Sequence, residues 1–409
     1  MFKTLKSLLA GTALTFATAA HAVDLEVTHW WTSGGEAVAV SKFAEAWNAT
    51  GNKWVDGAIA GSGGTARPII ISRILGGDPM AATQLNHGRQ AQELIEAGLL
   101  LDLTDVAEAG GWAKLVNPSS LLDACTLDGK IYCVPVNIHS AQWIWLSHEA
   151  YKNAGLEVPK NWNEFVASAP KLEAAGTLPL AMGQQGWQQN IAFGAITLAV
   201  AGLDAWKAVN VDKNAEVARG PKYKAAFEAV AKSRELASKS NVQDWNQATN
   251  MVITGKAGGQ IMGDWAQGEF AIAKQVEGKD YSCLPGLGLN AVLDTGGDAF
   301  YFPKIDDPKI AAAQKELAAM LISPEVQVSF NLAKGSLPVR GDIDMSAANG
   351  CMQKGLNILA DGGVLPSSDI SFSADTQTQI EDLMAQFWTS DMSAADAQAA
   401  YADLIEKAD

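Results

Sequence analysis

Strand-like and helix-like segments alternate in the first part of the 409-residue chain, after His21. Residues 25–30 alternate apolar and polar side chains, which is typical of a strand. The next segment repeats apolar residues at Val40, Phe43 and Trp47, the spacing of one helix face. The same alternation continues over residues 55–60, 69–75, 82–85 and 91–97. This order predicts an α/β fold with a parallel sheet and right-handed crossovers.

The first 22 residues have the three parts of a secretory signal peptide. Lys3 and Lys6 form a basic start, residues 7–19 are apolar or small, and Ala20-His21-Ala22 resembles a cleavage site. The apolar run is too short to span a bilayer, and no later run reaches about 18 apolar residues. We therefore expect an exported protein whose mature chain of 409 − 22 = 387 residues is long enough for two domains.

The charge balance is acidic, with 45 Asp+Glu against 30 Lys+Arg. Removal of the signal takes two lysines away and changes the net charge from −15 to (30 − 2) − 45 = −17. This balance argues against nucleic acid and anionic lipid as partners. A hydrophobic content of 48% with 18% charged residues excludes a disordered chain.

The four cysteines lie in the mature part of the chain, where disulfides persist after export. Asp128-Gly129 is a strong hairpin signal placed centrally between Cys125 and Cys133. The hairpin would bring these two sulfurs together and leave Cys283 to pair with Cys351. The alternative is four free buried thiols, while a zinc site is disfavoured because no C-x-x-C is present.

Tryptophan is common in this chain, with 13 Trp against six Tyr. Trp30 and Trp31 end the first predicted strand, at the edge where α/β sheets place their ligands. Neighbours on a strand face opposite ways, so both rings share a cleft only if residues 32–35 form a turn. The alternative places one ring in the core and the other in the cleft. Helical or core positions are expected for Trp47, Trp54, Trp112, Trp162, Trp206 and Trp388.

The signal and five short motifs resemble periplasmic solute-binding proteins of sugar ABC importers, above all the glucose- and mannose-binding subgroup. These motifs occur in the expected order and span essentially the whole mature chain. They are HWWTSGGE at 29–36, LDGK at 127–130, VPVNIH at 134–139, MGDWA at 262–266 and KGSLPVR at 334–340. The first and last of these motifs, taken together, are specific to this family.

The resemblance implies a two-lobe periplasmic-binding-protein fold, in which each lobe is a mostly parallel sheet flanked by helices and crossing strands form the hinge. We expect lobe 1 to comprise residues 24–137 and about 300–323, and lobe 2 about 138–299 and 324–409. Both lobes would be discontinuous in sequence.

The function implied by the resemblance is binding without catalysis and without a cofactor. A periplasmic monomer would capture a neutral sugar between closing lobes and deliver it to the membrane permease subunits of the importer. Glucose or a related aldose is the first expectation, and a disaccharide or a sugar alcohol is the alternative.

Residues of both lobes are expected to contact this sugar. A sugar offers hydroxyls and apolar C–H faces, so its site combines charged or amide groups with aromatic rings. The predicted ligand-binding residues are Trp30, Trp31, Glu36, Asn86, His87, Gln185, Trp187, Gln188, Asp264, Trp265, Asp298, Lys334 and Asp369.

Three of these residues have a structural alternative. Ser33-Gly34-Gly35-Glu36 is also a capping box, in which Glu36 would satisfy the backbone at Ser33. Trp265 would pack in the core, and Lys334 would complement the end of a helix.

Two departures from the glucose-binding relatives make glucose itself less secure. Those relatives carry a lysine in segment 84–88, where this chain has Asn86 or His87. They also carry a histidine after a Pro-Ser pair, whereas residues 366–370 contain none. Asp369 is the substitute acceptor that we expect there.

The main rival function is an exported glycoside hydrolase, for which Glu36 and Asp298 are the one carboxylate pair to nominate. The spacing of the histidines does not favour a metal site. Residues 61–64 lack the remainder of a nucleotide-binding motif and are more simply a turn. An adhesion protein is disfavoured because we find no internal repeat and no anchor.

Overall fold

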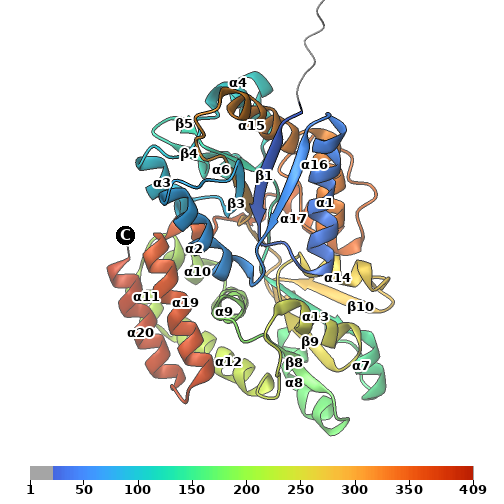
Figure 1. Cartoon of the computed structure of the whole chain (residues 1–409). Helices are drawn as coiled ribbons and strands as arrows, with labels where there is room; N and C mark the ends of the chain where they lie inside the picture. Colours follow the sequence, from blue (N-terminus) through green and yellow to red (C-terminus); the bar gives the residue numbers. More distant parts are fainter. Residues whose placement is uncertain (1–21, 409) are drawn as a thin grey trace, which may run out of the picture.

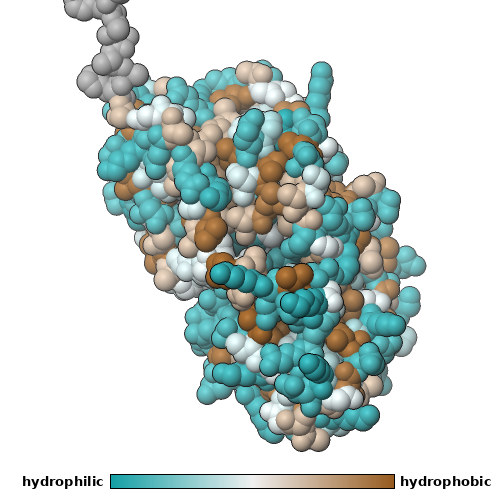
Figure 2. Space-filling model, turned by 90° about the vertical axis from the view of Figure 1, so that its right-hand side faces the viewer, coloured by the Kyte–Doolittle hydropathy of each residue, from teal (hydrophilic) through white to brown (hydrophobic). Residues whose placement is uncertain are grey.

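The computed structural model describes residues 22–408, apart from the side chains of residues 368 and 369. It shows two α/β lobes, one above the other in Figure 1. The predicted signal peptide falls outside the described residues except for its last position. Within the described range, every helix is too short or too polar to cross a membrane. On the face shown in Figure 2, hydrophobic residues are scattered in small groups over an elongated body.

The first lobe is built on a five-stranded sheet of order β2-β1-β3-β12-β6. Its strands are β1 (Asp24–His29), β2 (Lys53–Ala58), β3 (Ala82–Asn86), β6 (Cys133–Pro135) and β12 (Asp298–Tyr301). β1 pairs in parallel with β2 and β3, whereas β12 is antiparallel to β3 and β6. Leu25 and Val27 are fully buried, as the alternation in β1 predicts.

The second lobe contains a four-stranded sheet of order β10-β7-β9-β8. Its strands are β7 (Trp143–Ser147), β8 (Leu178–Ala181), β9 (Ala257–Ile261) and β10 (Tyr281–Pro285). β8 and β9 are parallel, but β7 is antiparallel to both of its neighbours.

The predicted two-lobe α/β class with mostly parallel sheets is confirmed, because four of the five strands of the first sheet and three of the four strands of the second run in the same direction. Each sheet is still of mixed orientation, because β12 in the first and β7 in the second run against the other strands. β7 and β12 are joined to their lobes through segments that cross between the lobes, so no helical crossover forces them to run parallel to their neighbours.

Helices cover both sheets (Figure 1). Those grouped with the first sheet are α1 (Gly34–Ala49), α2 (Ser62–Leu75), α3 (Gln92–Glu96), α4 (Thr104–Gly110), α5 (Trp112–Leu115), α6 (Ser120–Asp123), α15 (Pro308–Leu321) and α16 (Pro324–Lys334). Those grouped with the second are α7 (His148–Asn153), α8 (Trp162–Ala174), α9 (Gly186–Ala201), α10 (Leu203–Asn210), α11 (Ala215–Arg219), α12 (Pro221–Leu236), α13 (Trp245–Ile253), α19 (Ala374–Thr389) and α20 (Ala394–Lys407). The remaining helices are α14 (Ala266–Ile272), α17 (Gly350–Ala360) and α18 (Ser368–Ser371).

Local sequence explains where two of these helices begin and end. Ser323 precedes α16, Pro324 opens it, and Gly335 closes it in the left-handed conformation. The expectation of a turn over residues 61–64 is wrong, because α2 begins at Ser62. Gly61 and Ser62 supply the left-handed bend, with φ 103° and 63°, and the glycines after them lie in the first helical turn.

Three segments cross between the lobes and lie side by side. The first joins β6 to β7, the second precedes β12, and the third follows α16. Ile138 pairs with Leu337, and His139 pairs with Gly296. The crossing predicted near Asn137 is the first of these segments.

Both predicted disulfides are present. Cys125 and Cys133 flank the hairpin of β4 (Thr126–Leu127) and β5 (Lys130–Ile131), and the bond joins them. Asp128 turns this hairpin with φ 50°.

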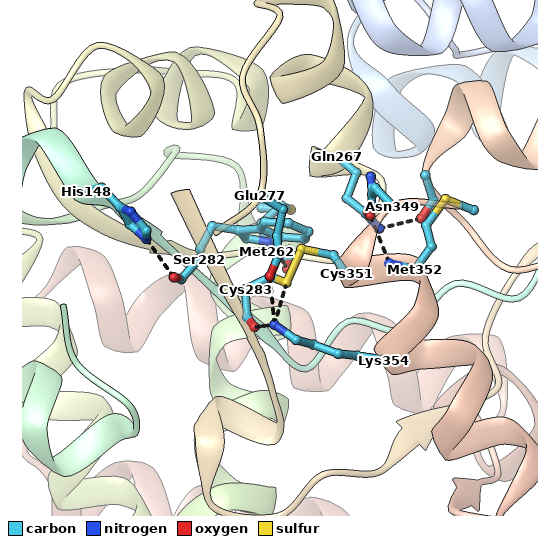
Figure 3. The surroundings of a disulfide bond; sticks show 12 residues. His148, Met262, Gln267, Glu277, Ser282, Cys283, Asn349, Cys351, Met352 and Lys354 are labelled. Atoms are coloured by element: carbon cyan, nitrogen blue, oxygen red, sulfur yellow. Dashed lines mark hydrogen bonds and ion pairs between the residues drawn. A yellow bond between two sulfur atoms is a disulfide. The ribbon is translucent and has the colours of Figure 1, made fainter. Parts of the chain in front are cut away.

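The second disulfide joins Cys283 of β10 to Cys351 of α17 (Figure 3). Lys354 lies beside it and donates hydrogen bonds to Glu277 Oε1 (3.0 Å) and to the Cys283 carbonyl oxygen (3.1 Å). The bond therefore ties the segment after the third crossing to the edge strand of the second lobe. This segment reaches the small parallel pair of β11 (Leu293–Asp294) and β13 (Val364–Leu365).

The packing of α16 differs from the expected lobe boundary at residue 324. Phe330 of α16 stacks on Phe43 of α1 at 4.1 Å between ring centroids, and α1 flanks the first sheet. Phe372 and the helices after it belong to the hydrophobic core of the second lobe. We therefore assign α16 to lobe 1 and the chain from Phe372 onward to lobe 2.

Candidate functional site

A cavity of about 290 Å³ lies where the two lobes meet. The first turns of α1 and α2 line it from lobe 1, α9 lines it from lobe 2, and the crossing segments close it. Its volume is near the lower end of the roughly 300–1,000 Å³ found for small-molecule sites. Eight predicted residues line this cavity: Trp30, Trp31, Glu36, Asn86, Trp187, Trp265, Asp298 and Lys334.

Tryptophan rings form one wall of the cavity. Trp265 lies immediately before α14, and its ring centroid is 6.4 Å from that of Trp187 on α9 and 6.5 Å from that of Trp245 on α13. The rings of Trp187 and Trp265 are tilted by 43°, while Trp245 meets Trp265 edge-on. Such rings offer flat apolar faces to a ligand.

Trp30 and Trp31 divide between cleft and core, which is the alternative that the strand geometry left open. Trp31 is 1% exposed and packs against Phe300 and Phe330, with ring centroids 5.8 and 5.3 Å away. Trp30 is less deeply buried, with the guanidinium of Arg67 5.9 Å from its ring centroid. Trp30 is therefore the more available of the two for stacking on a ligand.

Glu36 and Lys334 form a buried ion pair at the cavity wall. The Lys334 ammonium donates to Glu36 Oε1 at 2.6 Å, and the two residues are 1% and 8% exposed. Ser33 caps α1 by accepting a hydrogen bond from the Glu36 backbone N–H at 3.3 Å. The Glu36 carboxylate itself binds Lys334, so an ion pair replaces the glutamate half of the capping box, which was the structural alternative for Glu36.

His139, on the first crossing segment, joins two buried carboxylates. Its Nδ1 donates to Asp264 Oδ1 at 2.9 Å, and its Nε2 donates to Asp298 Oδ2 at 2.7 Å. Burial alone would lower the pKa of His139, but the two carboxylates outweigh burial and raise the pKa to about 9. The imidazole is therefore protonated at neutral pH.

Asp298 keeps little free capacity to accept hydrogen bonds. Burial would raise its pKa, but the charged His139 and Lys334 lower the pKa well below its usual range, so the carboxylate is ionised. Besides His139, Oδ1 accepts from Gln84 Nε2 at 2.6 Å and Oδ2 from Asn137 Nδ2 at 3.0 Å. A carboxylate has about four acceptor positions, so roughly one is left for a ligand hydroxyl.

Gln185 and Gln188 lie behind the cavity and hold one of its rings. Gln185 Oε1 accepts hydrogen bonds from Trp187 Nε1 at 2.7 Å and from Gln188 Nε2 at 2.9 Å. Gln185 Nε2 donates to Asp244 Oδ1 at 3.0 Å. These residues position Trp187 and are not part of the lining.

His87 and Asp264 also lie behind the lining. Burial lowers the pKa of His87 to about 4, so this ring is neutral, and it is packed beneath Gly297. Asp264 accepts from His139 and from the Ser140 backbone N–H at 3.1 Å, and burial raises its pKa. The side chain of Asp369, in α18, lies outside the described part of the structure.

Among the lining residues that were not predicted from the sequence are Arg67, His139, Trp206 and Trp245. His139 could have been predicted from the sequence, because it is the last residue of the VPVNIH motif. Arg67 was missed because residues 61–64 were expected to form a turn, whereas α2 already begins at Ser62 and contains Arg67. The Arg67 Nε donates a hydrogen bond to the Gly63 carbonyl oxygen at 3.0 Å. Trp206 was expected at a helical or core position.

Comparison with known proteins identifies the family. The model of the bacterial extracellular solute-binding protein family matches residues 32–328, well over half of the chain. The chain is a bacterial extracellular solute-binding protein. A probable sugar-binding periplasmic protein of Rhizobium meliloti (strain 1021) is 37% identical over 348 residues, covering 84% of this chain and 83% of the relative. A probable sugar-binding periplasmic protein of Brucella melitensis biotype 1 is 37% identical over 352 residues, covering 86% and 82%.

Solved structures share the fold of this solute-binding protein at low sequence identity. Maltose-bound MalE3 of T. maritima superposes with a TM-score of 0.75 at 18% identity, covering 94% of this chain and 100% of that one. A chitin oligosaccharide binding protein gives 0.74 at 17% identity, covering 95% and 99%. Because the family consists of substrate-binding proteins, the binding protein is not an enzyme, and the hydrolase built on Glu36 and Asp298 is not favoured.

Proposed function

We propose that this solute-binding protein captures a neutral sugar in the interlobe cavity and delivers it to the permease subunits of an ABC importer. The observation that carries the proposal is the chemistry of the cavity wall. The apolar rings of Trp187 and Trp265 lie in the same cavity as the charged groups of Asp298, Glu36 and Lys334. Rings suit the C–H faces of a sugar, and charged groups suit its hydroxyls.

The charges of the cavity favour a neutral ligand. Glu36 and Lys334 neutralise each other at 2.6 Å, and His139 lies between Asp264 and Asp298. A ligand carboxylate or ammonium group would have to compete with these existing pairs. A hydroxyl can accept from Lys334 and donate to Glu36 or Asp298 without breaking either pair.

Arg67 supports recognition without the lysine of the glucose-binding relatives. Its Nη1 donates to Asn86 Oδ1 at 3.4 Å, and both residues line the cavity. The guanidinium therefore brings a cationic donor to the position where those relatives carry a lysine. The replacement of that lysine by Arg67 supports a neutral sugar in general as the ligand more strongly than glucose in particular.

Closure would follow from the placement of these groups on different elements. A sugar held by Trp187 and Trp265 gains contacts with Glu36 and Arg67 only while the lobes are together. Ligand binding therefore favours the closed population. Names of relatives agree with a sugar as the cargo, because two of them are called probable sugar-binding periplasmic proteins.

A thermal-shift screen tests the proposal. The mature protein should gain several degrees in Tm with at least one monosaccharide, disaccharide or sugar alcohol, because a ligand of the native state stabilises it. A screen with no shift for any neutral sugar, but a shift with an amino acid or a peptide, would contradict it.

A further inference from the structure

Gly64 and Gly194 are unusual among the glycines whose surroundings the structure describes. They combine an ordinary φ with no described heavy atom within 4 Å of an added Cβ. Both line the interlobe cavity, Gly64 from α2 and Gly194 from α9. By contrast, Gly297 also lines the cavity, but an added Cβ there would clash with the Asn137 carbonyl oxygen.

Packing within the protein does not require a glycine at position 194. Gly194 is in the middle of α9, where glycine is less favourable than alanine by about 1 kcal/mol. Alanine would meet no described atom and would stabilise the helix. The empty space beside the bare backbone is therefore available to a ligand.

The position of Gly194 places this space beyond the tryptophan wall. Gly194 follows Trp187 by seven residues, two helical turns, so the two lie on the same face of α9 about 10.5 Å apart along the axis. Asn190 and Ile191 lie between them on that face and also line the cavity.

The cavity is also lined by a second aromatic group. Trp206 of α10, 7% exposed, packs with Leu198, one helical turn past Gly194, and this far part also includes the lining residues Asn210 and Phe372. The Asn210 amide donates to the Trp206 carbonyl at 3.0 Å and to the Tyr223 hydroxyl at 3.2 Å. Its side-chain carbonyl oxygen is an acceptor, so the far part repeats the pairing of an aromatic ring with a polar group.

We infer that the ligand is a sugar of two or more units. One ring lies against Trp187 and Trp265, and the next passes over the bare backbone of Gly194 toward Trp206. Gly194 is then a specificity-determining residue, because a side chain at this position would occupy the space of the second unit. Gly64 leaves corresponding room on the lobe 1 wall. This inference rests on the proposed sugar-binding function.

Calorimetric titration of the mature protein and its Gly194→Ala and Gly194→Leu variants tests the inference. The probes are glucose and mannose with the disaccharides maltose, cellobiose and mannobiose. We expect the wild type to bind at least one disaccharide ten or more times more tightly than its own monosaccharide. Gly194→Leu should weaken disaccharide binding at least ten times more than it weakens monosaccharide binding, since its side chain fills the second position.

Controls separate the effect of the site from the effect of the substitution. Ala312→Leu places the same leucine side chain on the exposed face of α15, away from the cavity, and should change no affinity. Gly194→Ala should keep or raise Tm, which shows that the variant helix folds.

Two results would overturn the inference while the sugar-binding function stands. One is a wild type that binds a monosaccharide as tightly as every disaccharide. The other is a Gly194→Leu variant that loses affinity for both classes by the same factor, or for neither. Failure of these probes and of every neutral sugar in the thermal-shift screen to bind the wild type would instead contradict the proposed function itself.

Discussion

Lys334 Nζ and Glu36 Oε1 lie 2.6 Å apart at the wall of the interlobe cavity, although 298 positions separate them in the chain. The pair joins the start of α1 to the end of α16. The Lys334 ammonium also lies 5.6 Å from the ring centroid of Trp31. The same contact therefore holds two helices together and presents a donor and an acceptor to the cavity.

Removal of one partner of this pair should destabilise the protein strongly. Lys334→Met leaves the Glu36 carboxylate buried without its cation, and breaking a buried pair costs about 3–5 kcal/mol. The double variant Glu36→Gln/Lys334→Met should be less destabilised than the sum of the single variants. Urea unfolding of the four proteins measures this coupling, and additive losses would show that the pair contributes nothing.

The protonated His139 should make the stability pH-dependent on the alkaline side. Its pKa is about 9 in the folded protein, against about 6.5 for an unperturbed histidine. The stabilisation is therefore fully present below about pH 6.5 and is lost as the pH rises through about 9. Its size is on the order of 3 kcal/mol, from about 1.4 kcal/mol per pKa unit.

Denaturant unfolding between pH 6 and 10 measures this effect. The variant His139→Gln should show a much flatter profile over that range, and His148→Gln, at a partly exposed position near Ser282, is the matched control. An equally steep loss of stability in the His139→Gln protein would assign the pH dependence to other groups.

The two tryptophans Trp31 and Trp265 should respond differently to alanine. Trp31 is 1% exposed among Phe43, Phe300 and Phe330, so Trp31→Ala should lower the free energy of unfolding by about 3–5 kcal/mol. Trp265→Ala should instead remove most of the sugar affinity. Paired unfolding and titration experiments separate the two roles. A Trp265→Ala protein with unchanged sugar affinity would argue against stacking on that ring.

The two disulfides should differ in their contribution to stability. Cys283–Cys351 closes a loop with a sequence separation of 68, against eight for Cys125–Cys133. By loop entropy alone, loss of Cys283–Cys351 should lower the free energy of unfolding by about 4 kcal/mol, and loss of Cys125–Cys133 should lower it by about 2.5 kcal/mol. Unfolding of the two double-serine variants gives the comparison, and equal losses would show that local strain or residual structure dominates.

Local patterns in the sequence predict much of the fold because they report local physics. The alternation in residues 25–30 indicated β1, and Ser323 with Pro324 marked the start of α16. Asp128-Gly129 placed a hairpin between Cys125 and Cys133, and the disulfide follows. The direction of β7 and β12 was missed, because strand direction depends on how the crossing segments connect the lobes.

The sequence predicted which residues line the site better than it predicted their contacts with one another. The family resemblance gave Trp187, Trp265, Asp298 and Lys334, which all line the cavity. Their partners are set by tertiary contacts, so the sequence could not show that Lys334 binds Glu36. The sequence also left open which of Trp30 and Trp31 faces the core, because that depends on the exact register of the turn after β1.

Isothermal titration of the mature protein with a panel of neutral sugars tests the interlobe sugar site most directly. We predict that at least one neutral sugar binds with a Kd in the micromolar range or below, and that Trp265→Ala weakens this binding at least a hundredfold, or about 2.7 kcal/mol. Absence of binding for every neutral sugar, or an unchanged Kd in the variant, would contradict the proposed site.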